Sequence, residues 1–383
     1  MEPEIQPSSQ EVLRAAAAEA ALTPEAVAPA TETKKFRRLR WIFVANQRLR
    51  CGWSALGFEI LDIAFFLIPG YFLIKFHLIT MQWVNGFTAS SAFIVELALF
   101  GAMVGAASLI AHVERRHSIL EYNLTGPRRI PHFFSGLAAG FVALSALMGA
   151  LAWGGWVQFG PVALSSAAIF EFGALWASTF LLVGLVEEGI YRCFLQATLT
   201  RGINFWWALG TVGAVCLGLI FAHKGNGVSA LYGFALLGLI PCLLLHLKKS
   251  QSAGFWQAVW VTTTLFGYGH VFNPGESWVG ISQVEFIGFI FCVSIRLTGS
   301  AWWAIGCHAA WDWAETFFYG TADSGRVGTG HFLTTSPKGN LLMSGGAAGP
   351  EGSLLVLGVM LLLLVAIIVI YGRKGTSTVR PAQ

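Results

Sequence analysis

Apolar runs long enough to cross a lipid bilayer recur along most of this 383-residue chain. A helix needs about 20 predominantly apolar residues to cross about 30 Å of hydrocarbon. The runs are continuous rather than alternating, which excludes an outer-membrane β-barrel. Only 11% of the residues are charged, whereas a soluble domain carries about 25%. The sequence therefore predicts an all-α, polytopic helical membrane protein with about 8–10 transmembrane helices.

Length and hydrophobicity place ten candidate spans along the chain. They are residues 54–76, 89–112, 134–156, 163–186, 206–222, 227–247, 256–272, 281–297, 300–318 and 354–371. Lysine and arginine fall at alternate connections, and the loops 77–88 and 157–162 contain no basic residue. By the positive-inside rule this alternation predicts an integral, multi-pass membrane protein with both termini in the cytoplasm.

The sequence divides into five segments. These are a disordered tail with a basic juxtamembrane stretch (1–50), N-terminal transmembrane helices (51–160), a core with an inserted hairpin at 211–255 (161–320), a Gly-rich loop (321–353) and a last span with a short tail (354–383). A loop of that length is expected either to cap a site or to be mobile. We expect two of its polar residues, Asp323 and His331, to be solvated.

Charge and cysteine content exclude several kinds of partner. The net charge is only +4, and the basic residues flank apolar runs, so we expect contact with the bilayer and none with nucleic acid. The six cysteines lie mostly inside apolar runs and include no CxxC pair. They are interpreted as small packing residues rather than as a disulfide or zinc framework.

Ionisable side chains inside the spans are the strongest functional signal, because each one costs at least a few kcal/mol in hydrocarbon. Glu187 and Glu188 follow one apolar run, and Arg192 follows Glu188 by four residues. On a helix this spacing predicts a Glu188–Arg192 ion pair. Glu187 points about 100° away from Glu188, so it is free to face a different cavity.

Two histidine motifs follow the glutamate pair. The first is Phe266-x-x-x-His270, followed by an Asn-Pro-Gly turn. The second is His308-x-x-x-Asp312, whose i, i+4 spacing puts both side chains on one helical face. Burying the second pair without a task is costly, so a membrane-embedded active-site cavity is predicted.

In this order, the three motifs resemble those of the CAAX protease and bacteriocin-processing family of intramembrane proteases (the Abi family). The resemblance covers roughly residues 160–320. It implies an endopeptidase that cuts near or within the membrane, and members similar to the Ras-converting enzyme remove the last three residues of prenylated CAAX proteins. Carried over by motif position, the implied site residues are Glu187, Glu188, Arg192, His270, His308 and Asp312.

The resemblance also implies roles for these residues. Glu187 would activate the attacking water, helped by His270, and the Glu188–Arg192 pair would hold the site together. His308 and Asp312 would bind the oxyanion or position the substrate. Since an ionised carboxylate cannot donate a hydrogen bond, Asp312 is expected to orient His308 or to bind a cation.

Two alternatives stay open. The set Glu187, His270, His308 and Asp312 is also a plausible zinc site, although the resemblance favours a mechanism without a metal or other cofactor. His223 is the alternative second-motif histidine, because relatives commonly place that motif closer to the glutamate pair.

The leading hypothesis is hydrolysis of a peptide bond in a lipidated, prenylated or membrane-anchored protein or peptide. A non-catalytic scaffold or immunity factor that binds a partner peptide is the alternative. A proton-coupled transporter is a third option, but no internal repeat supports it.

Overall fold

The computed structural model describes residues 42–45, 48–78, 88–222 and 227–372. The chain divides into two compact units, Met1–Gln47 and Arg48–Gln383, and every element from β2 onward belongs to the second unit. His223 and most of the predicted tail at 1–50 lie outside the described residues.

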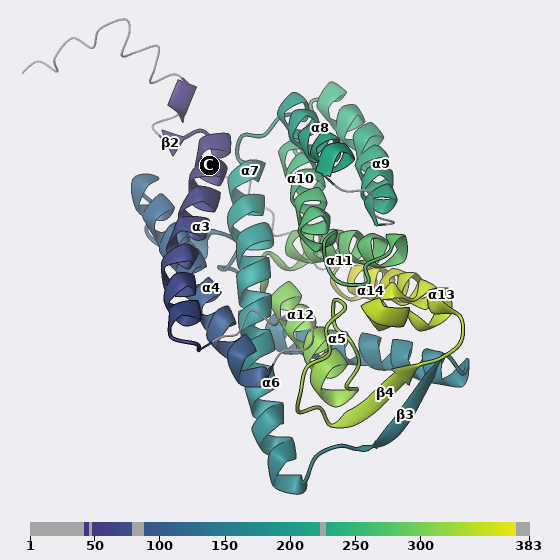
Figure 1. The fold of residues 1–383 in the computed structure, drawn as a ribbon. Helices are drawn as coiled ribbons and strands as arrows, with labels where there is room; N and C mark the ends of the chain where they lie inside the picture. Colours follow the sequence, from purple (N-terminus) through teal and green to yellow (C-terminus); the bar gives the residue numbers. More distant parts are fainter. Residues whose placement is uncertain (1–41, 46–47, 79–87, 223–226, 373–383) are drawn as a thin grey trace, which may run out of the picture. The chain divides into compact units, whose positions relative to one another are not determined.

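Helices make up most of the described chain (Figure 1). The α-helices are α3 (Cys51–Lys75), α4 (Ala89–Val113), α5 (Arg129–Trp153), α6 (Ser166–Glu188), α7 (Gln196–Thr200), α8 (Phe205–Ala222), α9 (Val228–Leu247), α10 (Ala253–His270), α11 (Trp278–Thr298), α12 (Trp302–Trp313), α13 (Leu341–Ser344) and α14 (Leu354–Tyr371). The shorter turns are η2 (Ile119–Glu121), η3 (Gly189–Leu195), η4 (Ala314–Phe318), η5 (Gly346–Ala348) and η6 (Pro350–Gly352), of which η3 and η4 are π-helical. The strands are β1 (Val44–Ala45), β2 (Arg48–Leu49), β3 (Val157–Val162) and β4 (Leu333–Pro337).

Seven helical runs in the described residues are long and apolar enough to cross a membrane. They are α3, α4, α5, the run Ser166–Thr200, α9, α11 and α14. Three other predicted spans are helical but are not among these seven. α12 is short, and α10 contains Gln257 and three consecutive threonines. α8 is apolar, and its stretch Phe205–Phe221 is only slightly shorter than the qualifying helices. The chain is thus an all-α, polytopic membrane protein.

Burial separates the outer helices from the inner one. In the most apolar 18-residue stretch of each helix, only 22% is buried in α14 and only 11% in α3, as expected for helices that face lipid. In α11, by contrast, 72% of the corresponding stretch is buried. The hydroxyl of Ser277 caps the start of α11 by accepting the Gly280 N–H at 3.2 Å, and Gly299 ends it in the left-handed region at φ 81°.

α12 packs between α5 and α6, and glycines allow the close approach to α5 (Figure 1). A Cβ at Gly136 would collide with the carbonyl oxygen of Trp303, and one at Gly140 with that of Cys307. The two glycines form a Gly-x-x-x-Gly pair, the spacing that lets membrane helices bring their backbones together. This contact fixes the helix that carries His308.

We expect Gly140→Ala to destabilise the protein by about 1–3 kcal/mol, because the added methyl group has no space against α12. The matched control is Gly149→Ala on the same helix, where a Cβ meets nothing within 4 Å and the better helix former should be neutral or stabilising. Thermal unfolding in detergent checks both variants. Equal melting temperatures for the two would contradict tight α5–α12 packing.

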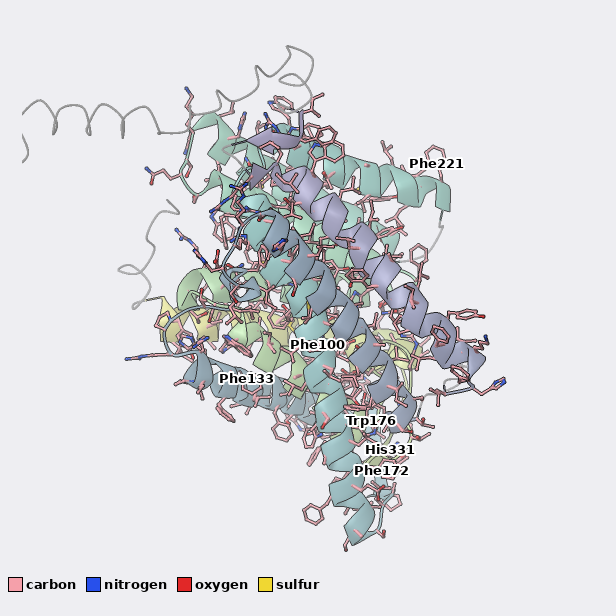
Figure 2. The ribbon with its side chains drawn as sticks, turned by 90° about the vertical axis from the view of Figure 1, so that its left-hand side faces the viewer. Phe100, Phe133, Phe172, Trp176, Phe221 and His331 are labelled. Carbon is pink, nitrogen blue, oxygen red and sulfur yellow. The ribbon has the colours of Figure 1, made fainter. Side chains whose placement is uncertain are left out.

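The Gly-rich connection at 321–353 is ordered against the helices. β4 pairs antiparallel with β3, with Val157 opposite Pro337 and a register irregularity between Phe159 and Val162. On α6, Trp176 Nε1 donates to the Thr329 carbonyl at 3.1 Å. Figure 2 shows Trp176 and Phe172 of α6 beside His331 of this connection. Of the two expectations for this loop, a cap over a site is therefore the one that fits its packing.

Candidate active site

Glu187 and Glu188 lie where α6 passes into the π-helical turn η3. The predicted end of this span at residue 186 is wrong, because the helical run continues from Ser166 to Thr200. π-Helical turns inside α-helices occur frequently at functional sites. The Glu188 side chain is fully buried, whereas that of Glu187 is 31% exposed. The two carboxylates thus point to different surroundings, as the helical spacing predicts.

Arg192 is fully buried and forms an ion pair with Glu188. Its Nη1 lies 3.4 Å from Glu188 Oε1, which is the expected i, i+4 ion pair. The guanidinium carbon lies 3.9 Å from the ring centroid of Phe266, a cation–π distance. Arg192 therefore joins the glutamate motif to the second motif through both charge and ring stacking.

His308 joins both glutamates to Asp312. Its Nδ1 lies 2.9 Å from Glu188 Oε1. Because the carboxylate can only accept, Nδ1 carries a proton and donates a hydrogen bond to Glu188. Its Nε2 lies 3.7 Å from Glu187 Oε2 and 3.4 Å from Asp312 Oδ2. Two carboxylates around one ring nitrogen stabilise a proton there, so this arrangement favours an imidazolium that can donate from Nε2.

His270 ends α10 and approaches Glu187 from a different helix than His308. Its Nδ1 lies 2.8 Å from the Phe266 carbonyl oxygen, which can only accept, so Nδ1 carries the proton. A neutral His270 then presents a lone pair at Nε2, 4.0 Å from Glu187 Oε2. Two acceptors at that separation leave a place for one bridging water that donates to both.

A cavity of about 170 Å³ connects these groups. Its polar lining comprises Glu96, Thr179, Glu187, His270, Gln283, His308, Trp311, Asp312, Asp323, Ser324, Arg326 and Glu351. Apolar residues such as Phe180, Val183 and Ile287 form the remaining wall. All three sequence motifs therefore contribute side chains to one cavity.

The loop residues of this cavity were missed by the sequence analysis. Asp323 is wrongly predicted as solvated, since it is half-buried in the cavity wall together with Glu351. Burial raises the pKa of Asp323 to about 6. Burial, reinforced by the charge of Asp323, raises the pKa of Glu351 to about 8. The only signal in the sequence was the length of this loop, because contacts between its two ends are not encoded by local spacing.

The four predicted zinc ligands are arranged loosely. Within the described residues, no three of Glu187, His270, His308 and Asp312 have ligand atoms that all lie within 4.8 Å of one another. The Nδ1 atom of His308 is also engaged by Glu188. A four-coordinate zinc ion needs its ligand atoms about 2.0–2.3 Å from the metal. The four side chains as placed do not fit that requirement.

The family model described as type II CAAX prenyl endopeptidase Rce1-like matches residues 242–314. That stretch contains the whole of α10, α11 and α12, with His270, His308 and Asp312. Over these residues the chain is similar to the type II CAAX prenyl endopeptidases. No curated protein and no solved structure matches it.

The chain is an integral, multi-pass membrane protein. The glutamate pair and Arg192 lie outside the matched residues. They are linked to the family's motifs by the contacts of Glu188 with His308 and of Arg192 with Phe266.

Proposed function

We propose that this protein is a CAAX-type protease that hydrolyses a peptide bond of a lipidated or membrane-associated protein by a water that Glu187 activates. The observation that carries the proposal is the position of the Glu187 carboxylate between two imidazoles. His270 Nε2 lies 4.0 Å from Glu187 Oε2, and His308 Nε2 lies 3.7 Å from the same atom. One histidine offers an acceptor and the other a donor, so the two imidazoles differ in function.

In the first step, Glu187 takes a proton from the water bound between its carboxylate and His270. The water oxygen forms a bond to the substrate carbonyl carbon, and the carbonyl electron pair moves onto its oxygen. His270 keeps the water oriented through the Nε2 lone pair, since its Nδ1 proton is held by the Phe266 carbonyl.

In the second step, the oxyanion is stabilised and the intermediate collapses. His308 donates from Nε2 to the developing negative charge, while Asp312 at 3.4 Å keeps that ring protonated. The C–N bond breaks as Glu187 returns its proton to the leaving amine nitrogen. Glu188 and Arg192 act by holding His308 and the helix in place.

The buried charge network of this protein favours an enzyme over the non-catalytic scaffold. A scaffold that only binds a partner peptide has no need for a buried charge network, which costs several kcal/mol per ion to desolvate. Here the Glu188 and Arg192 side chains are both fully buried, and Glu188 also contacts His308, the histidine proposed to stabilise the oxyanion. Prenylation of the substrate is proposed from the family alone.

The test is to map new protein termini in host membranes that express wild type or Glu187→Ala at equal levels. Cleaved termini that appear only with wild type would establish proteolysis and identify the substrate class. Their lipidation state, read by mass spectrometry of the released and retained fragments, would decide whether a prenyl group is required.

The matched control is Glu171→Gln, an exposed glutamate on the same helix α6. It should give the same termini as wild type. Identical terminus maps for wild type, Glu187→Ala and His308→Ala under several growth conditions would overturn the enzyme proposal in favour of the scaffold.

A further inference from the structure

Three carboxylates, two of them close in sequence and the third from the far end of the connection, meet beside the proposed catalytic cavity. Glu315 lies on the π-helical turn η4, Asp323 follows in the connection, and Glu351 lies on η6 before α14. One oxygen from each lies within 4.8 Å of those from the other two. Like charges this close repel, so the cluster must bind protons or a cation to persist.

The side chains that hydrogen-bond directly to this cluster are neutral. Thr316 Oγ1 donates to Asp323 Oδ2 at 3.1 Å, and Trp311 Nε1 donates to Glu351 Oε1 at 3.1 Å. Over residues 48–78, 88–222 and 227–372, no lysine, arginine or histidine nitrogen forms an ion pair with any of the three carboxylates. Arg326 and His308 act on Asp323 by charge without forming an ion pair with it, so no protein cation directly contacts the three carboxylates in the described chain.

Glu315 provides a separate indication of a missing ligand. Its side chain is 0% exposed, and neither carboxylate oxygen has a hydrogen-bond partner in the described chain. A buried carboxylate without partners is strongly unfavourable, because it loses its hydration and gains nothing. Gln283, which donates to Glu351 at 3.4 Å, also has a buried Oε1 without a partner. The cluster thus offers several unused oxygen acceptors.

We propose that Glu315, Asp323 and Glu351 bind a hard divalent cation of the size of Ca²⁺. Carboxylate and amide oxygens without nitrogen or sulfur select this class of ion over zinc. Two oxygens on opposite sides of Ca²⁺ lie about 4.6–5.2 Å apart, since each Ca–O distance is about 2.3–2.6 Å. Opposite ligands of Mg²⁺ lie about 4.0–4.2 Å apart, so the 4.8 Å limit admits either ion. Ca²⁺ is favoured because it accepts irregular oxygen geometry, whereas Mg²⁺ demands a near-ideal octahedron and usually keeps several waters.

Such a cation would fasten the connection to the catalytic helix. Glu315 follows Asp312 by one turn, whereas Asp323 and Glu351 lie near the two ends of the connection and line the cavity. A Cβ at Gly349 would collide with the Ala322 carbonyl oxygen, so the two ends of the connection already pack together here. By binding all three carboxylates, the cation would hold η4 and the two ends of the connection together at a place where packing alone leaves polar groups in contact.

The experiment uses Tb³⁺ as a luminescent substitute for Ca²⁺ on the full-length protein in detergent after EDTA treatment. Trp311 is hydrogen-bonded to Glu351, one of the proposed ligands, so its indole is close enough to transfer excitation to the bound ion. We expect saturable emission that Ca²⁺ displaces and that Mg²⁺ displaces more weakly. Trp311→Phe should lower the emission several-fold, and Glu315→Gln should weaken binding by at least about 10-fold.

Thermal unfolding separates loss of the site from loss of the fold. Ca²⁺ should raise the melting temperature of wild type and of the control Glu171→Gln, but not that of Glu315→Gln. In EDTA, Glu315→Gln should be at least as stable as wild type, because one of three repelling charges is gone. Absence of saturable binding up to millimolar Ca²⁺, or equal binding by Glu315→Gln, would overturn the proposal, and neither readout depends on protease activity.

Discussion

Glu187→Gln should lower the turnover number by about 10²–10⁴-fold, the usual contribution of a general base. Glutamine keeps the shape of the side chain but cannot take a proton from water. The carboxylate is 31% exposed to the cavity, and its Oε2 has no hydrogen-bond partner in the described chain, so the variant should melt within a few degrees of wild type. Turnover of the substrate identified by terminus mapping, measured together with the melting temperature, checks both statements.

Glu188→Gln is the comparison for this experiment. Its side chain is 0% exposed and contacts both Arg192 and His308, so the substitution should reduce stability as well as activity. A Glu187→Gln protein that still turns over substrate at close to the wild-type rate would rule out Glu187 as the base. Equal loss of stability in both variants would mean that Glu187 is structural.

Arg192→Met should destabilise the protein by about 3–5 kcal/mol, the usual result of removing one partner of a buried ion pair. Met fills much of the space beside Phe266, but the Glu188 carboxylate is left in the interior with the His308 ring as its remaining partner. Thermal unfolding in detergent, with activity measured on the folded fraction, tests this expectation.

The double variant Glu188→Gln/Arg192→Met provides the control. Removing both charges together should recover most of the lost stability, because no uncompensated charge is then buried. A double variant that is as unstable as Arg192→Met would show that packing, and not charge, makes Arg192 important. Unchanged stability of Arg192→Met itself would contradict the buried ion pair.

Periodicity and spacing predicted those features that depend on neighbours along one helix. The i, i+4 pairs Glu188–Arg192 and His308–Asp312 were predicted because a helix brings such residues together wherever it lies. The membrane class was predicted because hydrocarbon requires apolar length, a property of local sequence. The match of residues 242–314 to the CAAX prenyl endopeptidase family model agrees with the motif resemblance over that stretch.

Features that depend on how helices stack could not be predicted in this way. The helix that begins at Ser166 continues past the predicted end at residue 186, which places Glu187 and Glu188 inside the bundle. The short helix α12 is held close to α5 by Gly136 and Gly140, although α12 alone is too short to cross a membrane. Local hydrophobicity contains no information about either arrangement.

By itself the sequence determined the all-α membrane architecture, the three motifs and the pairing of charges within each helix. Only the tertiary structure decided that His270 and His308 both approach Glu187 Oε2, and that Asp323 and Glu351 of the predicted solvent-exposed loop line the same cavity. The physical reason is the range of the interactions. Helix contacts repeat every three or four residues and are legible in the chain, whereas contacts between separate helices and loops depend on packing in three dimensions.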